Sequence, residues 1–138
     1  MPDEFYISGD KAKLDIDLIH RFLSEESYWA KGRSLGTVKT SIENSECFGV
    51  YSGNRQVGFA RVVTDYAVIG WIMDVFILKE FRGRGLGKKL MNDLLNHERL
   101  RNLRTFRLAT EDAHGLYAQF GFKPLEKPRN MMERISGD

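Results

Sequence analysis

The chain has 138 residues, of which 42% are hydrophobic and 29% charged, and its formal net charge at pH 7 is +2. This length and balance are typical of a globular protein, so we expect a single domain over residues 1–138. The small charge does not predict nucleic-acid binding, and the absence of a long apolar run predicts a cytoplasmic protein with no membrane partner.

The first half of the chain predicts a short strand, two helices and then three strands in succession. The helices carry modest apolar faces and are expected at 15–26 and 37–44. The strands are expected at 5–8, 46–51, 56–63 and 67–78. Because the later strands are joined by short connections, such as the hairpin sequence Ser52-Gly53-Asn54-Arg55, they should be antiparallel neighbours.

The second half predicts a strand–helix–strand unit. Apolar residues at positions 86, 90, 91, 94 and 95 have helical spacing, and a strand is expected near 104–110. Two strands joined in this way are parallel, with a right-handed crossover, so the sheet is mixed. A helix at 113–120, ended by Gly121, and final strands at 122–125 and 131–135 complete the prediction. The fold class is therefore α+β, with six to seven strands and about four helices.

A glycine-rich turn lies between the strand at 67–78 and the helix that follows it. Gly83, Gly85 and Gly87 alternate there and leave successive backbone N–H groups uncovered by side chains. The N-terminus of the next helix adds unpaired N–H groups and positive dipole charge, which together favour a phosphate. Taken alone, the spacing of the glycines is explained about equally well by a phosphate-binding turn and by a turn that precedes a helix without binding a ligand.

Other phosphate and metal motifs do not match the chain. A Walker A motif would need a glycine at Arg82 and a Ser or Thr at Lys89, and the dinucleotide fingerprint would need two residues, rather than Leu86 alone, after Gly85. The lone Cys47 excludes an internal disulfide and, with three scattered histidines, predicts no zinc site. We expect Cys47 to be a core residue rather than an acyl-accepting nucleophile.

Two motifs resemble those of the GNAT superfamily of N-acyltransferases. The run from Asp74 to Gly87 ends in Arg82-Gly83-Arg84-Gly85-Leu86-Gly87, similar to the acetyl-CoA motif, in which Arg or Gln is followed by x-x-Gly-x-Gly/Ala. The sequence Ala113-His114-Gly115-Leu116-Tyr117, closed by Gly121-Phe122, resembles the second signature. Together the motifs cover about residues 72–125. The resemblance implies a GNAT-like twisted mixed sheet whose central βαβ unit holds acetyl-CoA.

The resemblance also implies an activity and a set of cofactor contacts. An acetyl group would pass from acetyl-CoA to a primary amine of a small molecule or peptide, by direct attack in a ternary complex. The pyrophosphate would lie on the amides of residues 83–88, and the pantetheine arm would pair with 75–77, in a slot between 74–77 and 107–110. Thr110 is a weak contact, because relatives often have asparagine there. The expected cofactor-binding residues are Val75, Phe76, Ile77, Arg82, Gly83, Arg84, Gly85, Leu86, Gly87, Lys88 and Thr110.

Acyl transfer needs a neutral amine, a stabilised oxyanion and a proton for the departing thiolate. Tyr117 matches the family tyrosine whose hydroxyl approaches the CoA sulfur, and backbone N–H groups around 75–77 would hold the oxyanion. Asp74 is the only acid in the strand 67–78, so it is the candidate base, directly or through water. A structural or substrate-orienting carboxylate is the alternative, since many relatives carry a glutamate at the position of Met73.

Acceptor specificity is expected from the first half of the chain. Tyr28, Trp29 and Arg33 form an aromatic and basic cluster that suits an acceptor pocket or the packing of a loop, and Asp65 and Tyr66 are further candidates. A non-catalytic acyl-CoA sensor is the alternative function. A homodimer formed through the exposed end strands is a possible assembly by analogy with the family.

Overall fold

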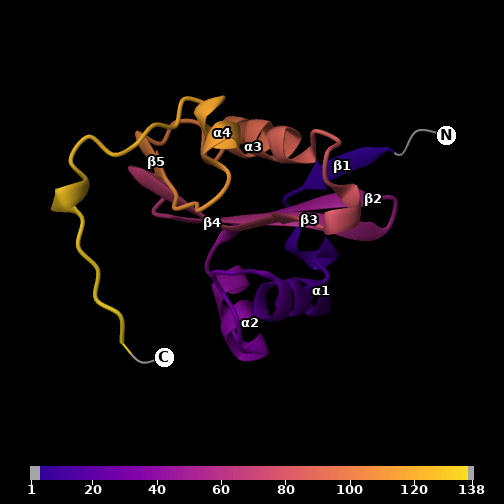
Figure 1. Ribbon diagram of the computed structural model, residues 1–138. Coiled ribbons are helices and arrows are strands. Elements are labelled where there is room, and N and C mark those ends of the chain that lie inside the picture. Colours follow the sequence, from indigo (N-terminus) through magenta and orange to yellow (C-terminus); the bar gives the residue numbers. More distant parts are fainter. Residues whose placement is uncertain (1–3, 137–138) are drawn as a thin grey trace.

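The computed structural model describes residues 4–136, which form one mixed sheet with helices on both faces (Figure 1). The strands are β1 (Phe5–Ser8), β2 (Glu46–Ser52), β3 (Arg55–Thr64), β4 (Ile69–Ile77) and β5 (Thr105–Arg107). The α-helices are α1 (Ile16–Arg21), α2 (Leu35–Glu43), α3 (Leu86–Asn96) and α4 (His114–Ala118). A π-helical segment, η2 (Phe22–Glu26), continues α1, and short 3-10 turns are η1 (Lys11–Lys13), η3 (Lys79–Phe81) and η4 (Pro128–Asn130).

The strand order in the sheet is β1-β2-β3-β4-β5. Neighbouring strands are antiparallel from β1 to β4, and β4 and β5 are parallel. The helix α3 makes the crossover between the two parallel strands. The α+β class and the expected central βαβ unit are therefore confirmed.

Two helical layers enclose the sheet, with α1 and α2 on one face and α3 and α4 on the other (Figure 1). The middle strands β2 and β3 are buried along nearly their whole length, because both of their faces are covered. The helix α3 turns one apolar stripe to the sheet, and its buried residues are Leu86, Leu90, Met91 and Leu94. The spacing in the sequence thus predicted this helix and its buried face.

The prediction of six to seven strands is wrong for the described residues, which form five. The strand expected at 104–110 is confined to Thr105–Arg107, and the segments 122–125 and 131–135 are not strands. A strand exists only where a neighbouring backbone accepts and donates its hydrogen bonds. Residues 123–136 run away from the sheet instead, so their pattern finds no partner strand within residues 4–136 (Figure 1).

The helices of the structure are all modest in length. Among residues 4–136, none combines the length and apolar character that crossing a bilayer requires.

Candidate active site

The strand β4 carries a β-bulge at its centre. Asp74 and Val75 together stand opposite the single residue Ala60 of β3, and Asp74 has a φ of 56°, in the left-handed region. Aspartate tolerates this conformation better than most residues, and a bulge re-aims the side chains around it. The Asp74 carboxylate is thereby directed to the side of the sheet that carries α1 and α2, where its partners lie.

The pairing of β4 with β5 is short. It extends only over Ile69–Trp71 of β4, opposite Thr105–Arg107, and the two strands then diverge. The remaining part of β4, from Ile72 to Ile77, therefore turns an edge of backbone N–H and C=O groups toward a gap. Such an edge can accept an extended ligand as if it were another strand.

A cavity of about 510 Å³ lies where the two strands separate. Its lining comes from β4, from the loop 108–113 that follows β5, from α4 and from the loop between η2 and α2. The residues concerned are Tyr28, Trp29, Arg33, Trp71, Ile72, Met73, Asp74, Val75, Leu108, Ala109, Thr110, Glu111, Asp112, Ala113 and Tyr117. The hydroxyl of Tyr28 accepts a hydrogen bond of 2.8 Å from the backbone N–H of Glu111, which joins two walls of the cavity.

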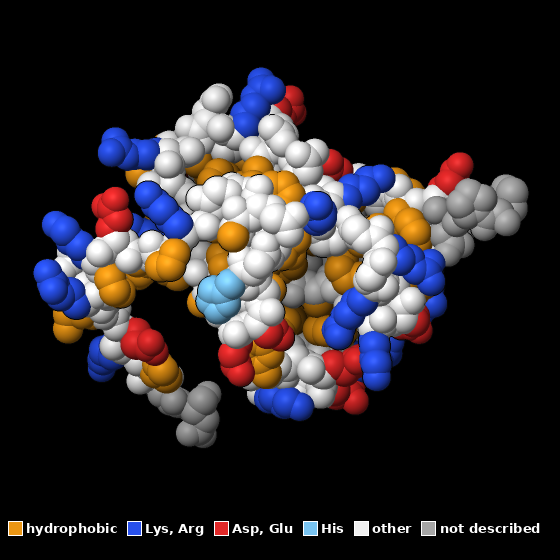
Figure 2. All heavy atoms as spheres, turned by 45° about the horizontal axis from the view of Figure 1, so that its top comes forward, with side chains coloured by type: hydrophobic (Ala, Val, Ile, Leu, Met, Phe, Trp, Pro, Cys, Tyr) orange, Lys and Arg blue, Asp and Glu red, His pale blue; other side chains and the backbone are white. Residues whose placement is uncertain are grey.

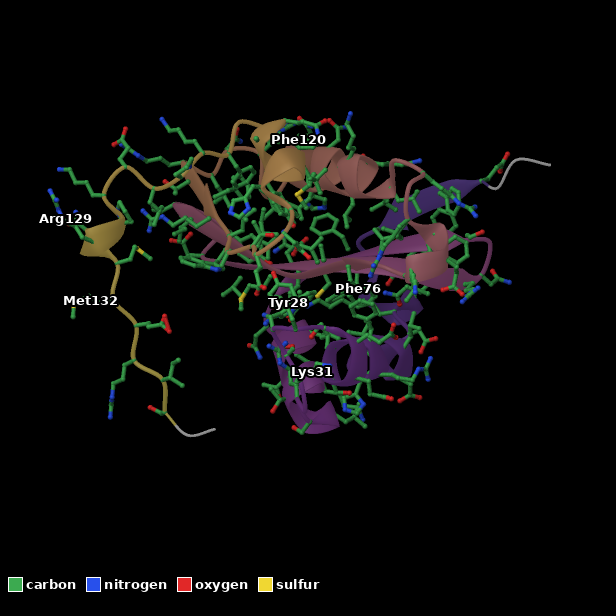
Figure 3. The ribbon with its side chains drawn as sticks, in the orientation of Figure 1. Tyr28, Lys31, Phe76, Phe120, Arg129 and Met132 are labelled. Carbon is green, nitrogen blue, oxygen red and sulfur yellow. The ribbon has the colours of Figure 1, made fainter. Side chains whose placement is uncertain are left out.

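This cavity brings together residues that the sequence placed far apart. Both predicted catalytic residues, Tyr117 and Asp74, line it, as do the predicted cofactor contacts Val75 and Thr110. The proposed acceptor cluster at 28, 29 and 33 lines it too. Figure 3 shows Tyr28 beside the sheet on the side that carries α2. The other acceptor candidates, at 65 and 66, lie in the β3–β4 turn and do not line the cavity.

The Asp74 carboxylate is buried, with a side-chain exposure of 1%, and it accepts hydrogen bonds from three side chains. Its Oδ1 accepts from Nε1 of Trp29 at 2.8 Å. Its Oδ2 accepts from Nη1 of Arg33 at 2.8 Å and from Nε of Arg61 at 2.6 Å. Arg61 also donates to Oγ of Ser45 at 3.1 Å. Two guanidinium groups thus surround one carboxylate, and these contacts favour an orienting role for Asp74; its role as a base stays a prediction.

Sequence reasoning missed Arg61. Its side chain is 8% exposed, yet it lies within the apolar run of β3, between Ala60 and Val62. A charged residue inside a strand buried on both faces needs a buried partner of opposite charge. That rule could have identified Arg61 as a partner of the single acid on β4.

Tyr117 lies in α4 with only 7% of its surface exposed, and its ring meets that of Phe122 edge-on at 5.9 Å. Burial raises the pKa of its hydroxyl to about 12, and the nearby Tyr28 and Asp112 act in the same direction. Desolvation disfavours the phenolate, so the group remains an O–H donor at neutral pH. It is therefore available to donate a hydrogen bond into the cavity.

The glycine turn forms the entrance to α3. Gly83 and Gly85 have φ values of 78° and 75°, in the left-handed region that glycine adopts without strain, and the space beside each is open. The first hydrogen bond of the helix runs from the N–H of Lys89 to the carbonyl of Gly85. The preceding N–H groups, from Leu86 to Lys88, have no helical acceptor and point out of the N-terminus.

Basic side chains stand around this turn. Arg82 donates from Nε to the carbonyl of Ile77 at 2.9 Å, and Arg84 lies over the rings of Phe5 and Phe81. Lys89 donates to the carbonyl of Phe5 at 2.9 Å. Figure 2 shows lysine and arginine side chains gathered at the right of this face of the molecule. The turn thus offers backbone donors in a positive field, as a diphosphate requires.

Gly87 lies where α3 meets α4. A Cβ atom at this position would lie 3.4 Å from Cδ2 of Leu116, an ordinary van der Waals distance. This contact brings the helix of the glycine turn next to the helix of Tyr117.

The residues present offer a suitable group for each part of coenzyme A. The N-terminus of α3 suits the diphosphate, the free edge of β4 suits the amides of the pantetheine arm, and the cavity beside Tyr117 suits the thioester. Among residues 4–136, histidine, cysteine and acidic side chains form no group of three that could hold a metal ion.

Comparison with known proteins gives the family. The GNAT acetyltransferase domain model matches residues 43–124, more than half of the chain. A Pyropia yezoensis protein named as an uncharacterized N-acetyltransferase is 31% identical over 126 residues, covering 86% of this chain and 70% of its own. A Gibberella zeae protein whose name proposes an acetyltransferase is 28% identical over 138 residues, covering 84% of this chain and 77% of its own.

Solved structures agree with this result. A crystal structure described as an acetyltransferase of the GNAT family from Xanthomonas campestris pv. campestris is 49% identical, with a TM-score of 0.93, and covers 99% of this chain and 95% of its own. A Clostridium acetobutylicum protein crystallised with acetyl-CoA is 14% identical with a TM-score of 0.70, covering 97% of this chain and 96% of its own, and supports the fold alone. The chain therefore belongs to the GNAT family of acetyltransferases.

Proposed function

We propose that this enzyme transfers the acetyl group of acetyl-CoA to a primary amine of a small molecule or peptide by direct attack in a ternary complex. The observation that carries the proposal is the cavity between β4 and β5, which is lined both by Tyr117 and by residues of β4 beyond its pairing with β5. Direct attack needs no acyl-enzyme, in keeping with the burial of Cys47, whose thiol pKa is raised to about 11 by desolvation.

Acetyl-CoA would be held mainly by backbone groups. The amides of residues 83–88 would bind the diphosphate, with Arg82, Arg84 and Lys88 adding positive charge, and the pantetheine arm would pair with the edge of β4 at 75–77. Thr110 accepts the N–H of Ala113 at Oγ1, at 3.0 Å, so its hydroxyl hydrogen remains available to donate to the pantetheine.

In the chemical step the amine lone pair forms a C–N bond to the thioester carbon, and negative charge moves to the carbonyl oxygen. N–H groups of the free β4 edge, around Val75 to Ile77, are the proposed donors to that oxyanion. Collapse of the intermediate breaks the C–S bond, and the electron pair leaves on the sulfur of coenzyme A. The proton that the amine loses balances the proton that the thiol gains.

The raised pKa of Tyr117 decides how it helps the leaving group. A thiol has a pKa near 8.5, so full transfer of a proton from a phenol of pKa about 12 is uphill by about 5 kcal/mol. Donation of a hydrogen bond to the developing thiolate carries no such penalty. Tyr117 is thus proposed to stabilise the thiolate as a donor, while the proton itself derives from the attacking amine.

The acceptor would enter from the side of Tyr28 and Glu111. Glu111 and Asp112 are exposed acids beside the cavity, and they attract the ammonium form in which a primary amine arrives. The rings of Trp29 and Trp71 provide apolar walls for the body of the acceptor. Asp74 is proposed to fix Trp29 and Arg33 in these walls, with water as the first proton acceptor from the amine.

Thiol release from acetyl-CoA, measured with purified protein across a panel of primary amines, tests the proposal. We expect turnover with at least one class of amine and acetylation of that amine by mass spectrometry. A protein that is thermally stabilised by coenzyme A but releases no thiol with any amine would instead be the acyl-CoA sensor considered as the alternative.

A further inference from the structure

The charge cluster around Asp74 carries one more positive than negative charge. The Asp74 carboxylate lies between the guanidinium groups of Arg33 and Arg61, at 2.8 and 2.6 Å. Within residues 4–136, no second acidic side chain lies within ion-pair distance of either arginine, and the other partner of Arg61, the hydroxyl of Ser45, is neutral. A positive charge withdrawn from water is unfavourable unless an anion compensates it. The described residues therefore leave one positive charge of this cluster uncompensated.

This excess charge reaches the active-site cavity through Arg33. Arg33 lines the cavity with a side-chain exposure of 20%, whereas Arg61 does not line it. One hydrogen bond, from Nη1, joins the guanidinium of Arg33 to Asp74. Its other N–H groups have no acceptor among residues 4–136. A planar guanidinium with free donors matches the two oxygens of a carboxylate, so this part of the cavity wall suits an anionic group of that kind.

Arg33 is held in position at both ends of the residue. Its backbone N–H donates to the carbonyl of Ala30 at 3.0 Å, and its own carbonyl accepts from Nε2 of His20 at 3.1 Å. At the tip of the side chain, Nη1 is fixed by Asp74, which also accepts from the indole of Trp29. A side chain that is already ordered loses little conformational entropy when it binds a ligand. Arg33 and the neighbouring aromatic wall are thus preorganised.

A different wall of the cavity carries the opposite charge. Glu111 and Asp112 line the cavity, are exposed, and form no ion pair with a basic side chain of residues 4–136. The hydrogen bond between the Tyr28 hydroxyl and the N–H of Glu111 joins this wall to the loop that leads to Arg33. The cavity therefore has a positive and a negative side, which would orient a molecule that carries both charges.

We propose that the acceptor is a free amino acid or a similar small amino carboxylate, whose carboxylate binds Arg33 while its primary amine attacks the thioester. This inference rests on the proposed function and names the substrate class of the same site; the bonds made and broken are those of the acetyl transfer described above. The bound carboxylate gives the cluster two negative charges for its two guanidinium groups. A diamine would instead bring a second positive charge, and in a peptide a neutral amide replaces the carboxylate beside the terminal amine.

Matched acceptors that differ in the carboxylate test the inference. The common amino acids are compared with their amides and their decarboxylated amines, such as tyrosine with tyrosinamide and tyramine. We expect kcat/KM for the best amino acid, measured by thiol release from acetyl-CoA, to exceed that of its amide and its amine by at least about 10-fold, as one hydrogen bond between charged groups supplies. The amide has the more acidic ammonium group, so ease of proton loss cannot explain this order.

The possible outcomes separate this inference from the proposed function. Equal or faster turnover of the amides or amines would overturn the carboxylate contact and leave acetyl transfer intact. If no amine releases thiol, the proposed function fails, and calorimetry with the protein and coenzyme A still tests the contact. At least one amino acid should then bind at least about 10-fold more tightly than its amide. Equal affinities, or no binding of either, would overturn it.

Variants of Arg33 test the residue directly. Arg33→Gln leaves Asp74 paired with Arg61, one charge of each sign, so circular dichroism should be unchanged. The KM of the amino acid should rise at least about 10-fold and that of its amide less than about 3-fold, with partial recovery in Arg33→Lys. The control Lys31→Gln removes a positive charge from an exposed position of the same loop, outside the cavity lining, and should change neither KM. Equal changes for acid and amide in Arg33→Gln, in KM or in kcat, would refute the contact.

Discussion

Replacing Asp74 by asparagine removes one negative charge and one of the two oxygens that accept hydrogen bonds, while asparagine tolerates the left-handed backbone at this position. Two guanidinium groups then lose their shared counter-charge. Arg61 has a side-chain exposure of 8% and Arg33 of 20%. Breaking a buried ion pair in this way costs about 3–5 kcal/mol, and the partial exposure of Arg33 places the expected loss near the lower value, about 3 kcal/mol.

This loss can be measured as a shift in melting temperature. At about 2.1 cal/mol/K per residue, the unfolding entropy of this chain is about 0.3 kcal/mol/K, so a loss of about 3 kcal/mol lowers Tm by about 10 °C. The matched control is Glu80→Gln, which breaks the exposed pair with Arg55 at 3.5 Å and should change Tm by less than about 3 °C. Equal shifts for Asp74→Asn and Glu80→Gln would refute the idea that the Asp74 cluster is an electrostatic anchor.

The kinetics of Asp74→Asn distinguish its two possible roles. An orienting carboxylate predicts a higher KM for the amine with coenzyme A affinity unchanged, because the pocket wall of Trp29 and Arg33 loosens. A general base predicts instead a fall in kcat of about 10²–10⁴-fold with little change in KM, and the loss of the acidic limb of the pH profile.

Four further predictions concern Tyr117, Gly85 and Cys47. Tyr117→Phe should lower kcat by at least about 10-fold and leave the Kd of coenzyme A, measured by calorimetry, within about 2-fold; equal kcat values would remove the hydroxyl from the mechanism. Because the pKa of that tyrosine is raised to about 12, its loss of a proton should not reduce kcat of the natural chain between pH 7 and pH 10. Gly85→Glu should weaken coenzyme A binding by at least about 10-fold through strain and charge, whereas Gly115→Ala, at an exposed position of α4, should not. Cys47, with a pKa raised to about 11, should resist alkylation at pH 8 in the folded chain and react only after unfolding.

The sequence predicted most of what local pattern controls. The leucine spacing predicted α3, the glycines at 83, 85 and 87 predicted the turn before it, and the β-rich and apolar runs predicted β2 to β4. These features depend on backbone preferences and on which face of an element is apolar. Both are determined by residues that lie close together in the sequence. The two motifs then indicated where the cofactor belongs.

The features that were missed depend on distant parts of the chain. Nothing near Asp74 in the sequence reveals that Arg33 and Arg61 converge on its carboxylate. The segments 122–125 and 131–135 have strand-like composition, yet a strand also needs a neighbour, and residues 4–136 provide none beside them. The composition of the two segments could not reveal this, because it depends on where the rest of the chain lies.

The stacking of Phe22 on Phe76, with ring centroids 4.0 Å apart, has a consequence for the evolution of specificity. It fastens η2 to β4, and the ion pair of Arg33 with Asp74 fastens the far end of the connecting loop to the same strand. The intervening residues, 23–32, are thus held at both ends, and Leu23 and Ala30 within the segment lie in the core, whereas Tyr28 and Trp29 line the cavity. Substitutions at the cavity-lining positions should retain the fold while changing which amine is accepted, provided that the two end contacts and the core residues are kept.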